Sequence, residues 1–221
     1  SGYKESGYFP EAFINMLAFL GWNPGDEREI MSMDEMTEAF SLDRVSKSGA
    51  RFDADKAKWF NHEYLQKYPE EKLLAAFKAL LEKENVNNVS DAYVLQVINA
   101  IKDRADFVKD FIPHGLYFFK RPESYDAGAV KKHWRENSAE NIGLIAEEFE
   151  KCEDWKADIL ENIVKEQIEK HEMPGGKIFN GIRILLVGAS SGPHIFDILE
   201  ILGKEESMIR LKEDITRIEQ G

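Results

Sequence analysis

GYFPEAFINMLAFLGWNPGDEREIMSMDEMTEAFSLDRVSKSGARFDADKAKWFNHEYL occupies residues 7–65. Its first part predicts an amphipathic helix, because Pro10 stands where a first helical turn tolerates a missing N–H. Apolar residues then recur on one helical face, at Phe13, Ile14, Leu17 and Leu20. Gly21 is expected to end this helix before a turn at residues 22–25. The first helix of a compact helical unit is therefore expected at the start of this stretch.

Two further short helices are expected in the same stretch. Ser32 followed by Glu35 three residues later is typical of a capping box. Asp53 is expected to cap the next helix, which carries Trp59 and Phe60.

The remaining chain has the apolar periodicity of helices with polar outer faces. Ser90, Ser138 and Asp154 stand where N-terminal caps are needed, and residues 122–130 predict an extended piece. The helices are expected at residues 69–84, 90–101, 138–149, 154–168, 193–202 and 206–218. The run IFNGIRILLVGA at residues 178–189 suits a buried strand as well as a helix.

Composition excludes several classes of protein. The formal net charge of −12 argues against a nonspecific nucleic-acid binder and confines any RNA contact to one locally basic face. A single cysteine, Cys152, excludes an internal disulfide and a cysteine zinc cluster. There is no apolar run long enough to span a bilayer, and we expect a cytoplasmic protein without a membrane partner.

The residues predict no catalytic or metal site. The histidines lack the spacing of metal ligands, and Gln66 stands where a second zinc ligand would follow His62 and Glu63. The small-residue loop from Gly188 to Gly192 lacks the Lys-Ser/Thr pair of a phosphate-binding loop. We interpret it as a tight loop where backbone can approach RNA bases closely.

The most basic stretch of the chain, residues 131–135, leaves two interpretations open. It is either a solvated helix face with Trp134 beneath it or a tRNA contact.

Blocks within residues 7–65 carry a family resemblance: GYFPEA at 7–12, LGWNPG at 20–25, VSKSGA at 45–50, FD at 52–53 and KWFN at 58–61. They resemble the segment after the catalytic domain in bacterial glutamyl-tRNA synthetases, the class I enzymes that charge tRNA with glutamate. Blocks spread over about sixty positions far exceed a short chance motif. RILLVG at 183–188, followed by a Pro-led helix from 193 to LGK at 202–204, is similar to the C-terminal motif of this family.

The resemblance implies an all-α fold in which residues 178–189 are helical. It implies a stem-contact helical unit at residues 1–66, and anticodon-binding subdomains at residues 67–150 and 151–221 that form an elongated bundle. The chain would be a C-terminal fragment without the catalytic Rossmann domain. The fragment itself would hold no cofactor and catalyse nothing, whereas the full-length enzyme would use ATP with Mg.

The resemblance also implies anticodon-binding residues, namely Arg104, Arg183, Gly192, Pro193, His194 and Ile195. Arg104 goes with rejection of the glutamine anticodon in the family. The residues alone leave other roles open, because Arg104 could pair with Asp103 or Asp106 and Arg183 could be a helix C-terminal charge. Candidate contacts to the tRNA backbone are Lys47, Lys102, Lys131, Lys132 and Arg135.

Lys47 lies in a segment with a second resemblance. VSKS at residues 45–48 looks like the loop with which class I synthetases hold ATP phosphates. In the resembling family this segment is separate from that loop, so we interpret it as a turn.

The expected partner is tRNA(Glu), bound by a monomer that binds no DNA. Two other functions stay open from the sequence. One is an acidic all-α protein-interaction module with no RNA role, and the other is a nondiscriminating synthetase that also charges glutamine tRNA.

Overall fold

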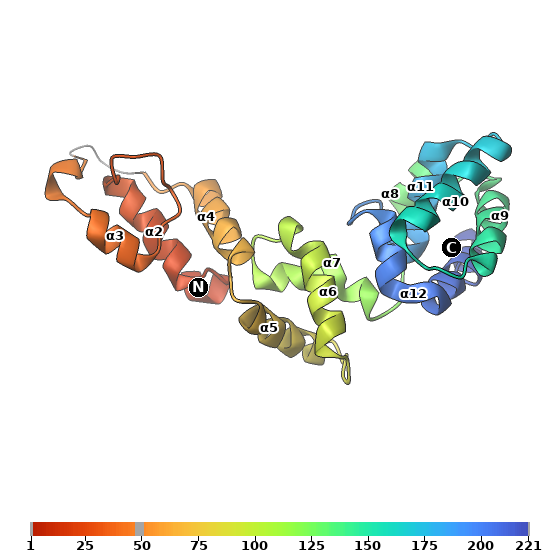
Figure 1. Cartoon of the computed structure of the whole chain (residues 1–221), viewed down its shortest axis with the longest axis horizontal. Helices are drawn as coiled ribbons and strands as arrows, with labels where there is room; N and C mark the ends of the chain where they lie inside the picture. The colour runs from red at the N-terminus through yellow and green to blue at the C-terminus, as the bar shows by residue number, and fades with distance from the viewer. Residues whose placement is uncertain (1, 47–50, 221) are drawn as a thin grey trace. The chain divides into compact units, whose positions relative to one another are not determined.

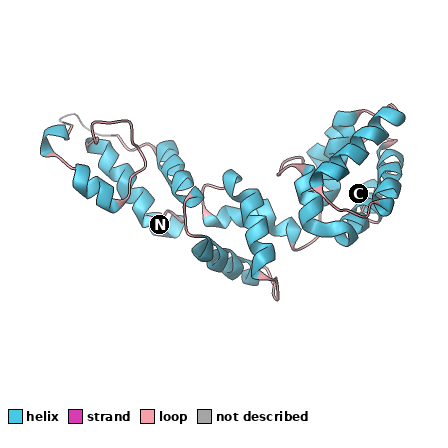
Figure 2. Ribbon diagram, in the orientation of Figure 1, coloured by secondary structure: helices cyan, strands magenta, loops and turns pink. Residues whose placement is uncertain are grey.

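The computed structural model describes residues 2–46 and 51–220. Over these residues the all-α prediction is confirmed, since helices and loops account for the described chain without a strand (Figure 2). An isolated bridge pairs Trp22 with Val45. In chain order the helices are α1 (Tyr3–Ser6), α2 (Pro10–Gly21), α3 (Met33–Ala39), η1 (Leu42–Arg44), α4 (Ala54–Gln66), α5 (Glu70–Lys83), α6 (Asp91–Ile101), η2 (Lys102–Arg104), η3 (Val108–Asp110), α7 (Phe111–Gly115), η4 (Leu116–Phe118), α8 (Ala127–His133), α9 (Ser138–Lys151), α10 (Ala157–Lys170), α11 (Gly175–Val187), α12 (Ile195–Lys212) and α13 (Ile215–Gln220).

These helices form two compact units. The described residues up to 87, together with 102–113, make the first unit, which holds α2, α3, α4 and α5 (Figure 1). Residues 88–101 and those from 114 onward make the second unit, which holds α6 and α8 to α13. The division into residues 1–66, 67–150 and 151–221 stays a prediction.

In the first unit α2 packs against α4, with Met16 and Phe60 in the shared core. Two buried asparagines tie this core to loops that would otherwise leave backbone groups unpaired. Asn61 accepts a hydrogen bond from the Phe9 N–H at 2.8 Å and donates to the carbonyl oxygen of Asp106. Asn15 accepts from the Met31 N–H at 2.9 Å. The loops therefore have a fixed register on α2 and α4.

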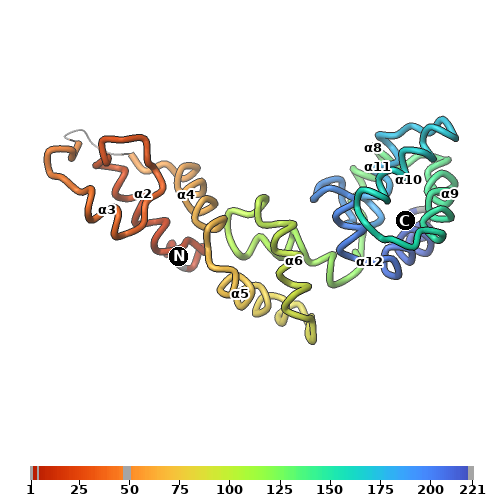
Figure 3. The backbone as a smooth tube through the Cα atoms, viewed as in Figure 1, coloured from red at the N-terminus to blue at the C-terminus, as the bar shows by residue number. Residues whose placement is uncertain are grey.

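The second unit is built from α9, α10, α11 and α12, which pack on one another, while α8 lies against α11 (Figure 3). The run at residues 178–189 is helical within α11, as the resemblance implied. Arg210 of α12 is only 1% exposed, and its guanidinium donates to Glu206 and to the carbonyl oxygen of Leu186. This cation is compensated by its carboxylate partner, as a buried charge requires.

Caps formed by neighbouring residues follow the sequence prediction. Ser32 and Glu35 form the predicted capping box of α3, and Asp53 accepts from backbone N–H groups at the start of α4. Ser90 Oγ accepts from the Tyr93 N–H at the start of α6.

Three local predictions are wrong. Residues 122–130 are not extended throughout, because Asp126 caps α8 through the Ala129 N–H and the helix begins at residue 127. Ser138 is the first residue of α9 and accepts from the Arg135 N–H instead of capping the helix. Asp154 does not cap α10; Glu200 of α12 accepts from the Ala157 N–H at 2.7 Å in its place.

Candidate nucleic-acid interface

Arg183 organises the loop between α11 and α12. Gly188 ends α11 in the left-handed conformation (φ 83°), which glycine adopts without strain. One turn earlier, Arg183 Nη1 donates to the carbonyl oxygen of Pro193 at 2.6 Å. A Cβ at position 192 would lie 3.2 Å from the same Nη1, so Gly192 leaves room for the guanidinium. Arg183 is therefore more than a helix-end charge, because it holds the loop that the resemblance assigns to anticodon contact.

Among residues 192–195 of this loop, His194 has the exposed side chain. Pro193 and Ile195 are buried and anchor the loop to the helical core. The His194 ring lies 5.3 Å from the ring of buried Phe196, and the residue stands at the start of α12. Residues 192–195 thus offer their backbone and one imidazole to a ligand, while the side chains of Pro193 and Ile195 face inward.

Arg104 belongs to the first unit, at the end of η2. Its side chain is exposed and forms no ion pair among the described residues. Asp106, which the sequence offers as its partner, instead lies 3.5 Å from His62 Nδ1 of α4. His62 also contacts the carbonyl oxygen of Ala105 at 2.9 Å. The backbone beside Arg104 is therefore held by α4, and the guanidinium keeps its donors for solvent or a ligand.

Lys102 precedes Arg104 in η2. Its carbonyl oxygen accepts from Gln66 Nε2 of α4 at 2.9 Å, which fixes the backbone at the start of η2. Lys47 lies outside the described residues.

A basic cluster surrounds the C-terminal end of α8 and consists of Lys131, Lys132, Arg135 and Lys177. Arg135 donates to the carbonyl oxygens of residues 131, 132 and 134, and Lys177 Nζ donates to that of Lys132 at 2.8 Å. These cations satisfy the last carbonyls of the helix and complement its dipole. Partial burial, followed by the charges of Lys132, Lys177 and Arg135, lowers the pKa of His133. The cluster is thus a locally positive surface on an acidic chain.

The predicted site residues fall into two groups. Arg183, residues 192–195 and the basic cluster share the second unit, whereas Lys102 and Arg104 belong to the first. Sequence reasoning missed Lys177, which joins the basic cluster from a helix 45 positions away from Lys132. No local pattern in the sequence signals that contact.

The described residues contain no group of three His, Cys, Asp or Glu side chains that could hold a metal ion. Within the same residues, none of the helices combines the length and apolar character needed to cross a membrane.

Comparison with known proteins assigns the class. The family model described as an anticodon binding domain matches residues 62–215, and the catalytic domain of class I tRNA synthetases (E and Q) matches residues 1–59. The chain belongs to the anticodon binding domain family.

The relatives are glutamate–tRNA ligases, which confirms the resemblance. Those of Porphyromonas gingivalis and Bacteroides thetaiotaomicron are 42% and 44% identical over 97% of this chain. A crystal structure of a glutamate tRNA ligase from Elizabethkingia meningosepticum, in complex with its amino acid, matches with a TM-score of 0.88 at 44% identity over 99% of this chain. The glutamate-tRNA synthetase of Elizabethkingia anophelis matches with a TM-score of 0.85 at 44% identity over 98%. The chain spans 42–43% of the length of these relatives.

Proposed function

We propose that this chain is the anticodon-reading part of a glutamate–tRNA ligase and that it binds the anticodon loop of tRNA(Glu). The main support is the anticodon binding domain match, which spans Arg104, Arg183 and the residue 192–195 loop. In this proposal a monomer binds one tRNA, and the basic cluster contacts its phosphates. ATP and magnesium act in the part of the longer relatives that this chain does not span.

Arg104 is the proposed discriminator. Single-stranded loop bases are recognised on their exposed Watson–Crick edges, and a guanidinium presents only donors. The anticodons of the glutamate and glutamine tRNAs differ in their last base. This base is cytosine in the glutamate anticodon and guanine in the glutamine anticodon. A donor fork matches the acceptor edge of cytosine, while the larger guanine presents its own N–H donors to the same fork. The exposed Arg104 side chain, with Asp106 turned to His62, supports this role.

Arg183 has a different proposed role. Its bond to the Pro193 carbonyl shapes the residue 192–195 loop, so that loop backbone and the His194 ring meet a second anticodon base. The first unit up to residue 66 is proposed to contact the inside of the tRNA elbow.

The test is a titration of the chain with two anticodon stem-loops that differ only in the last anticodon base. The cytosine form should bind more tightly, and its affinity should fall as salt rises because phosphate contacts release counterions. Arg104→Gln should reduce the preference for cytosine by about 1–3 kcal/mol. Arg44→Gln removes the same charge from another exposed position of the first unit and should leave the preference intact.

Three outcomes would decide between the alternatives. Equal binding of both stem-loops by the unmodified chain would favour a nondiscriminating synthetase. An unchanged preference in Arg104→Gln would remove Arg104 from the site. Absence of any salt-dependent RNA binding would contradict the proposal. A protein-interaction module without an RNA role is the weaker alternative, because the family that matches residues 62–215 is described as an anticodon binding domain.

A further inference from the structure

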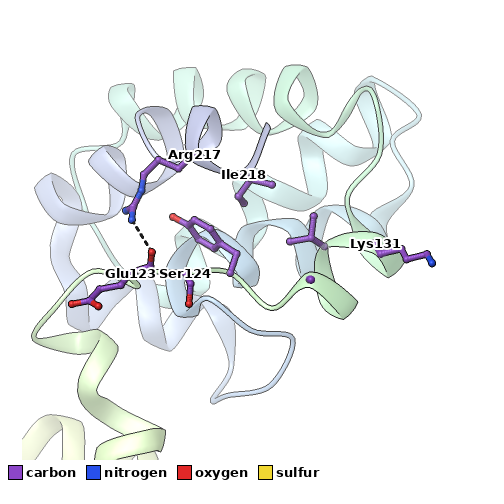
Figure 4. A pocket seen from close by; sticks show the side chains of 8 residues that line it. Glu123, Ser124, Lys131, Arg217 and Ile218 are labelled. Atoms are coloured by element: carbon purple, nitrogen blue, oxygen red, sulfur yellow. Dashed lines mark hydrogen bonds between the residues drawn. The ribbon is translucent and has the colours of Figure 1, made fainter. Parts of the chain in front are cut away.

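A cavity of about 480 Å³ lies in the second unit, between the segment before α8 and the C-terminal helix α13. Its apolar lining comes from Tyr125, Ala127, Val130 and Ile218. Figure 4 shows Arg217 and Glu123 at one side of this cavity and Lys131 at the opposite side. A pocket of this size with apolar walls and a few polar groups is typical of a small organic ligand site.

The cation Arg217 is held loosely over the aromatic wall. Its guanidinium carbon lies 5.7 Å from the centre of the Tyr125 ring. Its donors reach the Glu123 carbonyl oxygen at 3.3 Å and Asp214 Oδ1 at 3.4 Å, both longer than strong charge-assisted bonds. The guanidinium can therefore turn toward a ligand without losing a tight partner.

The cavity adjoins the candidate anticodon surface on two sides. Residues 122–126 pack against Gly188, where the interface loop begins, and the Asp126 N–H donates to the Gly188 carbonyl oxygen at 2.8 Å. On the other side, Lys131 belongs both to the cavity and to the basic cluster at the end of α8. A chain of phosphates that follows the basic cluster would thus pass the mouth of the cavity.

We propose that the cavity receives one unstacked nucleobase of the tRNA anticodon loop outside the three anticodon positions, with one flanking phosphate near Lys131 and the other near Arg217. This inference rests on the proposed function. A flat base suits apolar walls and can stack on an aromatic ring or a guanidinium plane. Two cations, Lys131 and Arg217, and one carboxylate, Glu123, line the cavity, and this positive balance favours a phosphate-bearing occupant over an apolar peptide.

The test combines an RNA series with a variant that fills the cavity. Anticodon stem-loops are made with a single abasic nucleotide at each loop position outside the anticodon. Base removal at one position should weaken binding to the unmodified chain about tenfold, the magnitude of one lost stack. Ala127→Trp should weaken binding of the intact stem-loop by the same factor. The same variant should show no further loss with that abasic RNA, because both changes remove one contact.

Ala92→Trp is the matched control, since Ala92 is also an exposed alanine in the first turn of a helix of the second unit. It should bind the intact stem-loop like the unmodified chain, and thermal unfolding should show both variants folded. If the unmodified chain binds no stem-loop, the proposed function fails and this inference falls with it. If it binds and no abasic position matters, this inference alone is wrong, whatever the variant does.

A free nucleotide has the same base and phosphate groups as a tRNA nucleotide, so a further experiment tests whether it is the occupant of the cavity. Cytidine and adenosine monophosphates are titrated into the unmodified chain and into Ala127→Trp. If filling the cavity abolishes monophosphate binding and leaves stem-loop binding unchanged, the cavity serves a free nucleotide and the tRNA proposal is overturned.

Discussion

At the scale of single residues, the structure shows contacts that the sequence leaves open. Arg104 has acidic neighbours on both sides in the chain, so a local ion pair was a reasonable expectation. The contact that turns Asp106 away comes from His62, 44 positions earlier, and no local pattern predicts it. Arg183 could be identified from the family motif, but its bond to the Pro193 carbonyl depends on the path of the whole loop. The family motif was thus enough to select candidate site residues, whereas the contacts of their side chains could not be predicted from the sequence.

Gly188 gives a prediction at this scale. A Cβ at this position would lie 2.9 Å from Pro122 Cβ and 3.0 Å from the Ser124 carbonyl oxygen, and φ is +83°. Gly188→Ala should therefore lower the free energy of unfolding by about 2–3 kcal/mol, measured by urea denaturation. Gly143→Ala, within α9 and with open space around it, should be neutral or stabilise by up to about 1 kcal/mol. Equal effects of the two substitutions would contradict the proposed strain.

At the scale of helices, the predictions succeeded where the determining contacts are short in sequence. The capping box of Ser32 and Glu35 and the Asp53 cap join groups within three residues, so sequence spacing was enough. The expected Asp154 cap was wrong because Glu200, 43 positions from Ala157, takes that place. The strand-like run in α11 was assigned correctly only through the family resemblance, since its composition suits either structure. Local chemistry therefore predicted the helices, and tertiary contacts decided several of their ends.

Glu200 gives the prediction for this scale. Its carboxylate accepts from the Ala157 N–H and pairs with Lys156, and these hydrogen bonds lower its pKa. Glu200→Ala should cost about 1 kcal/mol of unfolding free energy near neutral pH, as loss of a helix cap does. Glu205→Ala, at an exposed position of the same helix, should cost little.

The cost of Glu200→Ala should also depend on pH. A carboxyl group whose pKa is lower in the folded state stabilises the fold above its unfolded-state pKa, and that contribution disappears as pH falls through the folded-state value. The difference in unfolding free energy between Glu200→Ala and the unmodified chain should therefore be constant from neutral pH down to about pH 5. It should become smaller below about pH 4. A difference that grows in acid would contradict the assigned role.

At the scale of the whole chain, exposed apolar side chains are distributed unevenly. The large exposed apolar residues among those described all lie between residues 3 and 59: Tyr3, Ile14, Leu17, Met33, Phe40, Leu42, Val45, Phe52 and Trp59. The family model of the class I catalytic domain matches nearly the same stretch, residues 1–59. The anticodon binding part, by contrast, keeps its large apolar side chains covered. This distribution favours a further protein surface packed on the first unit in a longer chain.

The exposed leucines of this stretch should bind hydrophobic dyes. Replacing Leu17 and Leu42, which are 46% and 79% exposed, by serine should reduce binding of a hydrophobic dye such as anilinonaphthalene sulfonate. The double variant should keep its unfolding free energy within about 0.5 kcal/mol, because exposed side chains away from caps and cores contribute little to stability. Serine at the exposed Ala75 and Ala79 of α5 is the matched control and should leave dye fluorescence unchanged. A longer chain with a complete class I catalytic domain should bind less dye per molecule than this one, since that domain would cover Leu17 and Leu42. Equal dye binding by both chains would mean that these leucines face solvent in the longer protein as well. The inference that a further protein surface covers them would then be wrong.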